Sequence, residues 1–254
     1  MRTKSQVFAA MILAATAGSA LAAGIAGPDE QEYNACVALT LKAPEDAFES
    51  AIAWRDQGGG VPAKHCVALA LIQLKEYVEA AGRLETLATE MHAKGMPLQA
   101  DVLDQAGNAW LLAGQTERAI GVFTAAHAIA PQNAEILIDR ARSYAALQKY
   151  KDATADLDQA LRIQPDHAEA HAFRASARRH LGDKAGALED AETSLAIDPG
   201  DVDALLERGI LRREAGDIKG ARADWLKVLL TAPGTPTADT AQANLQDMDL
   251  KKRD

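Results

Sequence analysis

The feature that most constrains this chain is a proline that returns at one constant spacing. Four prolines keep this spacing, and they are Pro131, Pro165, Pro199 and Pro233. Because proline lacks a backbone N–H and clashes with the preceding helical turn, each of them is expected to end a helix. Such a regular period predicts an array of repeated helical units, and a bundle of unrelated helices does not explain it.

Other residue types keep fixed distances from these prolines. Alanine precedes each of them by one constant interval, at Ala119, Ala153, Ala187 and Ala221. Glycine precedes three of them by a second, longer interval, at Gly114, Gly182 and Gly216, and Gln148 takes the fourth place. Glycine suits the left-handed end of a first helix, and alanine lets a second helix approach it closely. Each unit is therefore predicted to contain two helices joined by a tight turn.

In this pattern the chain resembles the tetratricopeptide-repeat family. Residues 100–133 fill the family's six typical positions with Gly107, Trp110, Ala119, Phe123, Ala126 and Pro131. Residues 134–167 fill them with Ala141, Tyr144, Ala153, Leu157, Ala160 and Pro165. The next two repeats depart from the family by carrying Arg178 and Arg212 where an aromatic residue is usual. The resemblance implies an all-α, right-handed α-solenoid of about six helix-turn-helix repeats with a C-terminal capping helix.

The repeat register predicts the division of the chain. We expect a signal peptide in residues 1–22, divergent repeats in 23–99, repeats three to six in 100–133, 134–167, 168–201 and 202–235, and a capping helix in 236–254. Arg2 and Lys4 precede an apolar run, and small residues at Ala20 and Ala22 are typical of a signal-peptidase site. The run is shorter than the roughly 20 residues that span a bilayer. The expected location is therefore periplasmic or secreted, with cleavage after Ala22 and no membrane insertion afterwards.

Charge and motifs restrict the function. With 36 acidic against 27 basic residues, the chain is a poor candidate for binding nucleic acid. It lacks a glycine-rich phosphate loop and a nucleophile elbow, and nothing in it implies a cofactor. His167 and His171 lie one helical turn apart, but Glu169 falls on the opposite side of that helix, whereas a zincin places its glutamate directly after the first histidine. We therefore expect no metal site and no enzyme, and interpret these histidines as a cap and a packing residue.

Arginine and aspartate recur together at positions 7 and 23 of the repeats. The three pairs are Arg140 with Asp156, Arg174 with Asp190, and Arg208 with Asp224. The repeat of residues 100–133 has Ala106 and Val122 there, so both partners are absent together. The matched acids predict structural ion pairs between the two helices of a repeat. An arginine ladder for a ligand is the alternative.

The chain has two cysteines, Cys36 and Cys66, on the first helices of two neighbouring predicted repeats. An even number of cysteines in an exported chain is usually oxidised. We therefore predict a disulfide between these two residues.

The family resemblance also implies a binding groove lined by the first helix of each repeat. Its predicted residues are Asn108, Arg142, Arg179, His180 and Arg213. No acid matches these arginines at a fixed offset, so we expect them to meet carboxylates of an extended peptide. Neutralisation of some of them by Glu214 and Asp139 is the alternative. The predicted function is a periplasmic adaptor or scaffold for a protein or peptide. The alternatives are a self-associating structural spacer and a metal-dependent hydrolase that uses the two histidines.

Overall fold

The computed structural model describes residues 28–93 and 98–250, and these form thirteen helices without a strand. The predicted signal peptide lies outside the described residues. The chain divides into two compact units at Gln132 and Asn133. The first unit contains α2 (Pro28–Thr40), α3 (Pro44–Asp56), α4 (Gly60–Gln73), α5 (Tyr77–Ala93), α6 (Gln99–Leu112) and α7 (Thr116–Ile129). The second contains α8 (Ala134–Ala146), α9 (Tyr150–Ile163), α10 (Ala168–His180), α11 (Lys184–Ile197), α12 (Val202–Glu214), α13 (Ile218–Thr231) and α14 (Pro236–Leu250).

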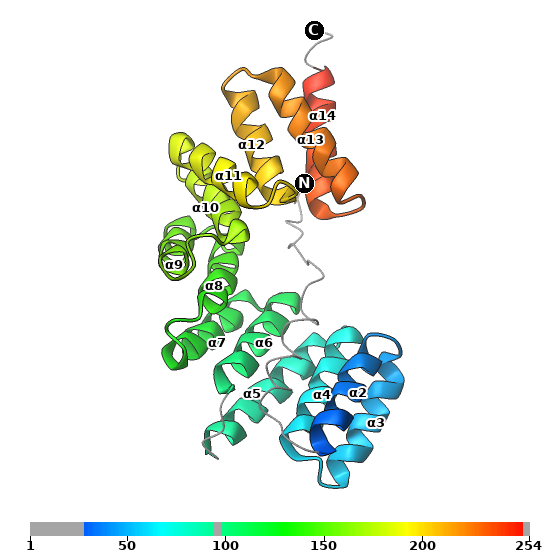
Figure 1. The fold of residues 1–254 in the computed structure, drawn as a ribbon. Coiled ribbons are helices and arrows are strands. Elements are labelled where there is room, and N and C mark those ends of the chain that lie inside the picture. The colour runs from blue at the N-terminus through cyan, green and yellow to red at the C-terminus, as the bar shows by residue number, and fades with distance from the viewer. Residues whose placement is uncertain (1–27, 94–97, 251–254) are drawn as a thin grey trace. The chain divides into compact units, whose positions relative to one another are not determined.

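Within each unit, helices that follow one another in the chain pack side by side (Figure 1). The first helices of neighbouring pairs also touch, as α2 does with α4, and α10 with both α8 and α12. Each of these first helices is thus in contact with its own second helix and with the first helix of a neighbouring pair. The predicted all-α helical-repeat solenoid is confirmed.

The periodic residues act at the helix ends. α7, α9, α11 and α13 each end just before one of the four periodic prolines. Asn133 and Asp201 begin α8 and α12, because their side chains accept hydrogen bonds from the exposed backbone N–H groups of Glu135 and Asp203, each at 3.0 Å. At the turn inside the α8–α9 pair, Gln148 has a φ of +59°, the left-handed conformation that glycine adopts in three other repeats.

Close contact between paired helices depends on a small residue beneath an aromatic ring. Gly209 lies under the buried ring of Trp225, and a Cβ placed on it would overlap the indole Nε1. Gly107 lies in the same way under Phe123. The core is otherwise built mainly of alanine and leucine, so the helices pack closely with few large side chains. Among the described helices, none is both long and apolar enough to cross a membrane.

Candidate functional site

The structure brings the three predicted arginine–aspartate pairs together between the helices of each pair. Arg140 donates to Asp156 through Nε and Nη2, both at 2.7 Å. Arg174 makes the same two bonds to Asp190, at 2.9 and 2.7 Å. The aspartates are almost completely buried, and the forked geometry satisfies both of their oxygens. These arginines are therefore held inside the repeat and are not a ladder that faces solvent.

A second arginine shares two of the buried aspartates, and the sequence analysis missed this role. Arg178 Nη1 lies 2.9 Å from Asp190, and Arg212 Nη1 lies 2.8 Å from Asp224. Both arginines stand where the family usually has an aromatic residue. The sequence did contain a signal for this role. Arg178 and Arg212 occur only in repeats that also carry one of the predicted arginine–aspartate pairs.

One face of α8, α10 and α12, shared by residues at matching repeat positions, is the candidate binding surface, and we call it the first-helix face. It includes Asp139, Arg142, Glu169, Phe173, Arg179, Asp203 and Glu207. Residues at these repeat positions share one side of their helix because they recur at intervals of three or four. Bonds between helices show that the face is continuous, since Arg179 on α10 contacts Glu207 on α12 at 2.5 Å. Asp203 on α12 accepts a hydrogen bond from Thr237 on α14 at 2.9 Å.

The three groove arginines already have acid partners within the chain. Arg142 donates to Asp139 at 2.8 Å, Arg179 binds Glu207 through two nitrogens, and Arg213 lies 3.3 Å from Asp247. The partners lie 3, 28 and 34 residues away along the chain, so no fixed offset revealed them. An external carboxylate would have to displace an acid that is already in place.

The other two predicted groove residues are also engaged. The ring of His180 stacks on that of Tyr150, with centroids 4.2 Å apart and the planes parallel. Burial and the neighbouring charge of Arg179 lower the pKa of His180. Asn108 is 5% exposed and donates to the backbone carbonyl of Asp104 at 3.3 Å. Asn108 belongs to the first unit, whereas the first-helix face belongs to the second, so the structure does not place it on that face.

Two further carboxylates of the first-helix face, Glu169 and Asp203, lie near the N-terminal ends of α10 and α12. Glu169 is exposed on α10; desolvation raises its pKa, and the charges of Arg142 and His167 act in the opposite direction. Burial also raises the pKa of Asp203 to about 6, and the charges of Asp201 and Glu207 raise it further. The hydroxyl of Thr237 and the charge of Arg142 act in the opposite direction on Asp203. Both acids are the second residue of their helix, where the helix dipole stabilises a carboxylate without an ion pair.

The predicted disulfide forms in the first unit and joins α2 to α4. The Cα atoms of Cys36 and Cys66 are 6.3 Å apart. Beside it, the hydroxyl of Tyr33 lies 2.7 Å from His65 Nδ1, and His65 Nε2 lies 2.6 Å from Gln105 Oε1. All three side chains are buried. This polar chain links the first helices α2, α4 and α6.

His167 and His171 both have protein partners. His167 Nδ1 accepts from the backbone N–H of Ala170 at 3.2 Å and so caps α10, while its Nε2 lies 3.0 Å from Glu135. His171 Nε2 lies 2.9 Å from the carbonyl of Pro165. Among the described residues, no group of three or more histidine, cysteine or acidic side chains is placed to hold a metal ion.

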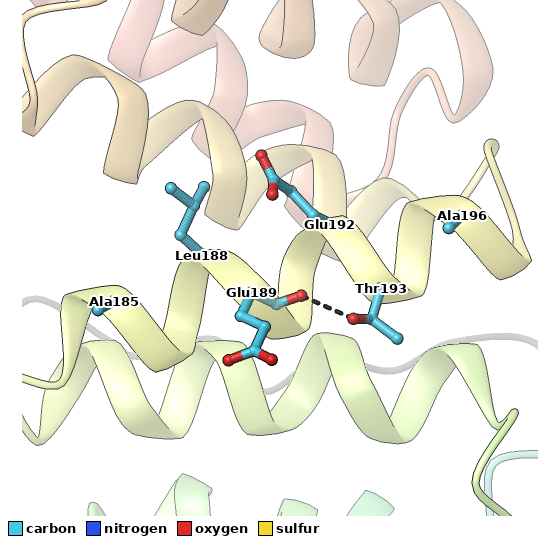
Figure 2. Close-up of a pocket in the computed structure, with 6 residues that line it drawn as sticks. All are labelled: Ala185, Leu188, Glu189, Glu192, Thr193 and Ala196. Carbon is cyan, nitrogen blue, oxygen red and sulfur yellow. Dashed lines mark hydrogen bonds between the residues drawn. The ribbon is translucent and has the colours of Figure 1, made fainter.

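A hollow of about 520 Å³ lies on a different surface, along one side of α11. Figure 2 shows its lining residues, which are Ala185, Leu188, Glu189, Glu192, Thr193 and Ala196. The hydroxyl of Thr193 donates to the helix's own carbonyl at Glu189, and the carboxylates of Glu189 and Glu192 point to opposite sides of the helix. Because its polar groups do not converge, this hollow lacks the arrangement that orients a ligand.

Comparison with known proteins agrees with this architecture. A family model described as tetratricopeptide repeat matches residues 111–177, which run from the last residues of α6 through α7, α8 and α9 into α10. The chain is a tetratricopeptide-repeat protein. Members of this family are generally non-catalytic scaffolds. No curated protein sequence matches it.

Solved structures from Thermus thermophilus and Parabacteroides merdae share the fold of this tetratricopeptide-repeat protein. TTC0263 from Thermus thermophilus is 19% identical over 75% of this chain and 100% of its own, with a TM-score of 0.59. A tetratricopeptide-repeat protein from Parabacteroides merdae is 22% identical over 83% of this chain and 75% of its own, with a TM-score of 0.57. The second such domain of human RPAP3, solved with the HSP70 peptide SGPTIEEVD, is 34% identical over 45% of this chain and 96% of its own, with a TM-score of 0.44.

Proposed function

We propose that this tetratricopeptide-repeat protein is an exported adaptor or scaffold, and that it binds a protein or an extended peptide at the first-helix face. The observation that carries this proposal is the continuity of that face. Three helices at the repeat spacing present polar and charged side chains, and bonds on this face join α10 to α12 and α12 to α14. A rigid, repeated surface of this kind loses little conformational entropy when an extended segment binds.

Export is supported by two independent features of the chain. Residues 1–22 have the basic start, apolar run and small residues of a signal peptide. The Cys36–Cys66 disulfide requires an oxidising compartment to persist. We expect a fusion of alkaline phosphatase to the C-terminus to be active only when residues 1–22 are retained. Equal phosphatase activity without them would contradict export by this segment.

A photo-crosslinking amino acid placed at Ala146 tests the binding surface. Ala146 is exposed near the C-terminal end of α8, at a repeat position that belongs to the first-helix face. The matched control places the same amino acid at Ala196, which is exposed on α11. We expect irradiation of living cells to yield a discrete adduct from the Ala146 variant and none from the control. Adducts from Ala196 alone would place the partner on the second helices.

Self-association is the second candidate, and exposed leucines on α13 favour it. Leu226 and Leu230 lie one turn apart on that helix and are 46% and 83% exposed. Light scattering after size-exclusion chromatography should then give a mass that rises with protein concentration. Leu230→Asp should abolish this rise. A single monomer mass over the whole concentration range would exclude this candidate.

A further inference from the structure

α2 is the first helix of the described chain, and few of its side chains hold it in place. Among those that the structure describes, Tyr33, Cys36 and Thr40 are buried. The hydroxyl of Thr40 donates to the carbonyl of Val37 on the same helix, at 2.8 Å. Within the described residues, the only side-chain hydrogen bond from α2 to another helix joins Tyr33 to His65. The disulfide is therefore the strongest single attachment of α2 to the repeats.

α14, the last described helix, is attached without a covalent bond. Its buried apolar residues are Ala238, Ala241, Leu245 and Met248. Thr237 at its start donates to Asp203 at 2.9 Å, and Asp247 near its end lies 3.3 Å from Arg213. The two end helices are thus held differently, α14 by apolar packing and polar contacts, and α2 chiefly by its disulfide.

α4, the helix to which the disulfide ties α2, is almost entirely apolar. Its buried residues are Val61, Ala63, His65, Cys66, Val67, Ala68, Leu69, Ala70, Leu71 and Ile72. Lys64 is its only acidic or basic side chain besides His65. α2 packs directly against α4 and so covers part of this surface. Because exposed apolar surface is unfavourable in water, the loss of α2 would give the first unit a new apolar edge.

We propose that the Cys36–Cys66 disulfide is a redox switch, in which a dithiol releases α2 from α4 while the helices that follow stay folded. The reduced chain then has an open apolar edge that the oxidised chain keeps covered. α4 retains its packing against α3 and α5, and α6 its packing against α5 and α7, so none of these helices needs α2 as a neighbour. The switch belongs to the first unit and goes beyond the proposed function, since the first-helix face belongs to the second unit.

The chemistry of the switch is thiol–disulfide exchange. A thiolate of the dithiol attacks the sulfur of Cys36, which is 8% exposed, whereas Cys66 is 0% exposed. The S–S bond breaks, Cys66 leaves as a thiolate that takes up a proton, and a mixed disulfide forms at Cys36. The second thiol of the dithiol then attacks the sulfur that the dithiol contributed to this mixed disulfide. Cys36 is released as a thiol, and the dithiol becomes a cyclic disulfide that has given up two electrons.

Hydrogen exchange measured by mass spectrometry on the full chain tests the switch, before and after treatment with dithiothreitol in native buffer. We expect the amides of α2 to exchange at least about tenfold faster in the reduced chain, and those of α6 and α7 to change by less than about twofold. α14 is the internal control, because its attachment involves no cysteine. Oxidised glutathione should restore the slow exchange of α2.

Two exchange results would overturn the proposal. Equal acceleration from α2 to α7 would show that the disulfide holds the whole unit and releases no single helix. Unchanged exchange in α2 after reduction would show that packing alone keeps it in place. A disulfide that dithiothreitol reduces only in denaturing urea would also reject the switch, because the bond would then not be accessible in the folded chain.

The sulfur atoms report the same opening. Iodoacetamide should label Cys66 in the reduced, folded chain as readily as Cys36, because the departure of α2 uncovers it. A Cys66 that resists labelling until the chain is unfolded would contradict the release of α2.

Cys36→Ser with Cys66→Ser is the matched variant, since it removes the bond permanently. Its α2 should exchange without dithiothreitol as fast as that of the reduced wild-type chain, and dithiothreitol should have no further effect. A response of this variant to dithiothreitol would place the effect of the reductant elsewhere. If the variant does not fold, the oxidised and reduced wild-type chains still decide the question, because they differ only in this bond.

Discussion

Replacing Asp190 by alanine tests whether the buried aspartates hold the repeats together. The carboxylate side chain is 3% exposed and accepts two hydrogen bonds from Arg174, and Arg178 lies 2.9 Å away. Its removal leaves two guanidinium groups that are only 15% and 24% exposed without their shared partner. Breaking a buried pair in this way costs about 3–5 kcal/mol. Because Arg174 keeps a bond to Asp158, we expect about 2–4 kcal/mol here.

Asp158→Ala is the matched control, since it removes the other acid partner of the same arginine. Arg174 Nη1 donates to Asp158 at 2.8 Å, but the Asp158 side chain is 41% exposed. An exposed pair contributes about 0–1 kcal/mol. Hydrogen exchange measured by mass spectrometry reports the opening free energy of α10 and α11 in each variant. If Asp190→Ala lowers this opening free energy no more than Asp158→Ala does, burial does not determine how much the ion pairs stabilise the helices.

Three further predictions concern the core of each unit. Reducing the Cys36–Cys66 bond, which joins positions separated by 30 in the sequence, should lower the unfolding free energy of the first unit by about 3–4 kcal/mol, and an unchanged urea midpoint would contradict this. Gly209→Ala should destabilise α12 and α13 by about 1–3 kcal/mol, because its methyl group would overlap the ring of Trp225, and an unchanged melting temperature would show that the ring moves aside freely. Burial lowers the pKa of His65 to about 4, so the unfolded chain takes up the proton more readily between pH 4 and 6.5 and stability should fall as the pH is lowered through that range. His65→Gln should remove that part of the pH dependence, and an identical pH profile for the variant would exclude His65 as its source.

The sequence by itself was sufficient to predict the helical repeat and the ion pairs between the two helices of one repeat. The proline period located the ends of four second helices, because proline stops a helix whatever surrounds it. The arginine–aspartate pairs were also visible, since residues 16 apart in an antiparallel helix pair face each other in every repeat that carries them. Local geometry fixes such contacts, so the same offset recurs and can be recognised.

Only the tertiary structure decided the character of the candidate binding surface. The partners of Arg142, Arg179 and Arg213 lie at three different sequence distances, on the same helix or on a neighbouring one. Which acid meets which arginine depends on the packing of neighbouring helices and on the reach of flexible side chains, and neither follows a period. Binding of acidic peptides at this surface stays a prediction, and the structure shows that its arginines already have acid partners within the chain.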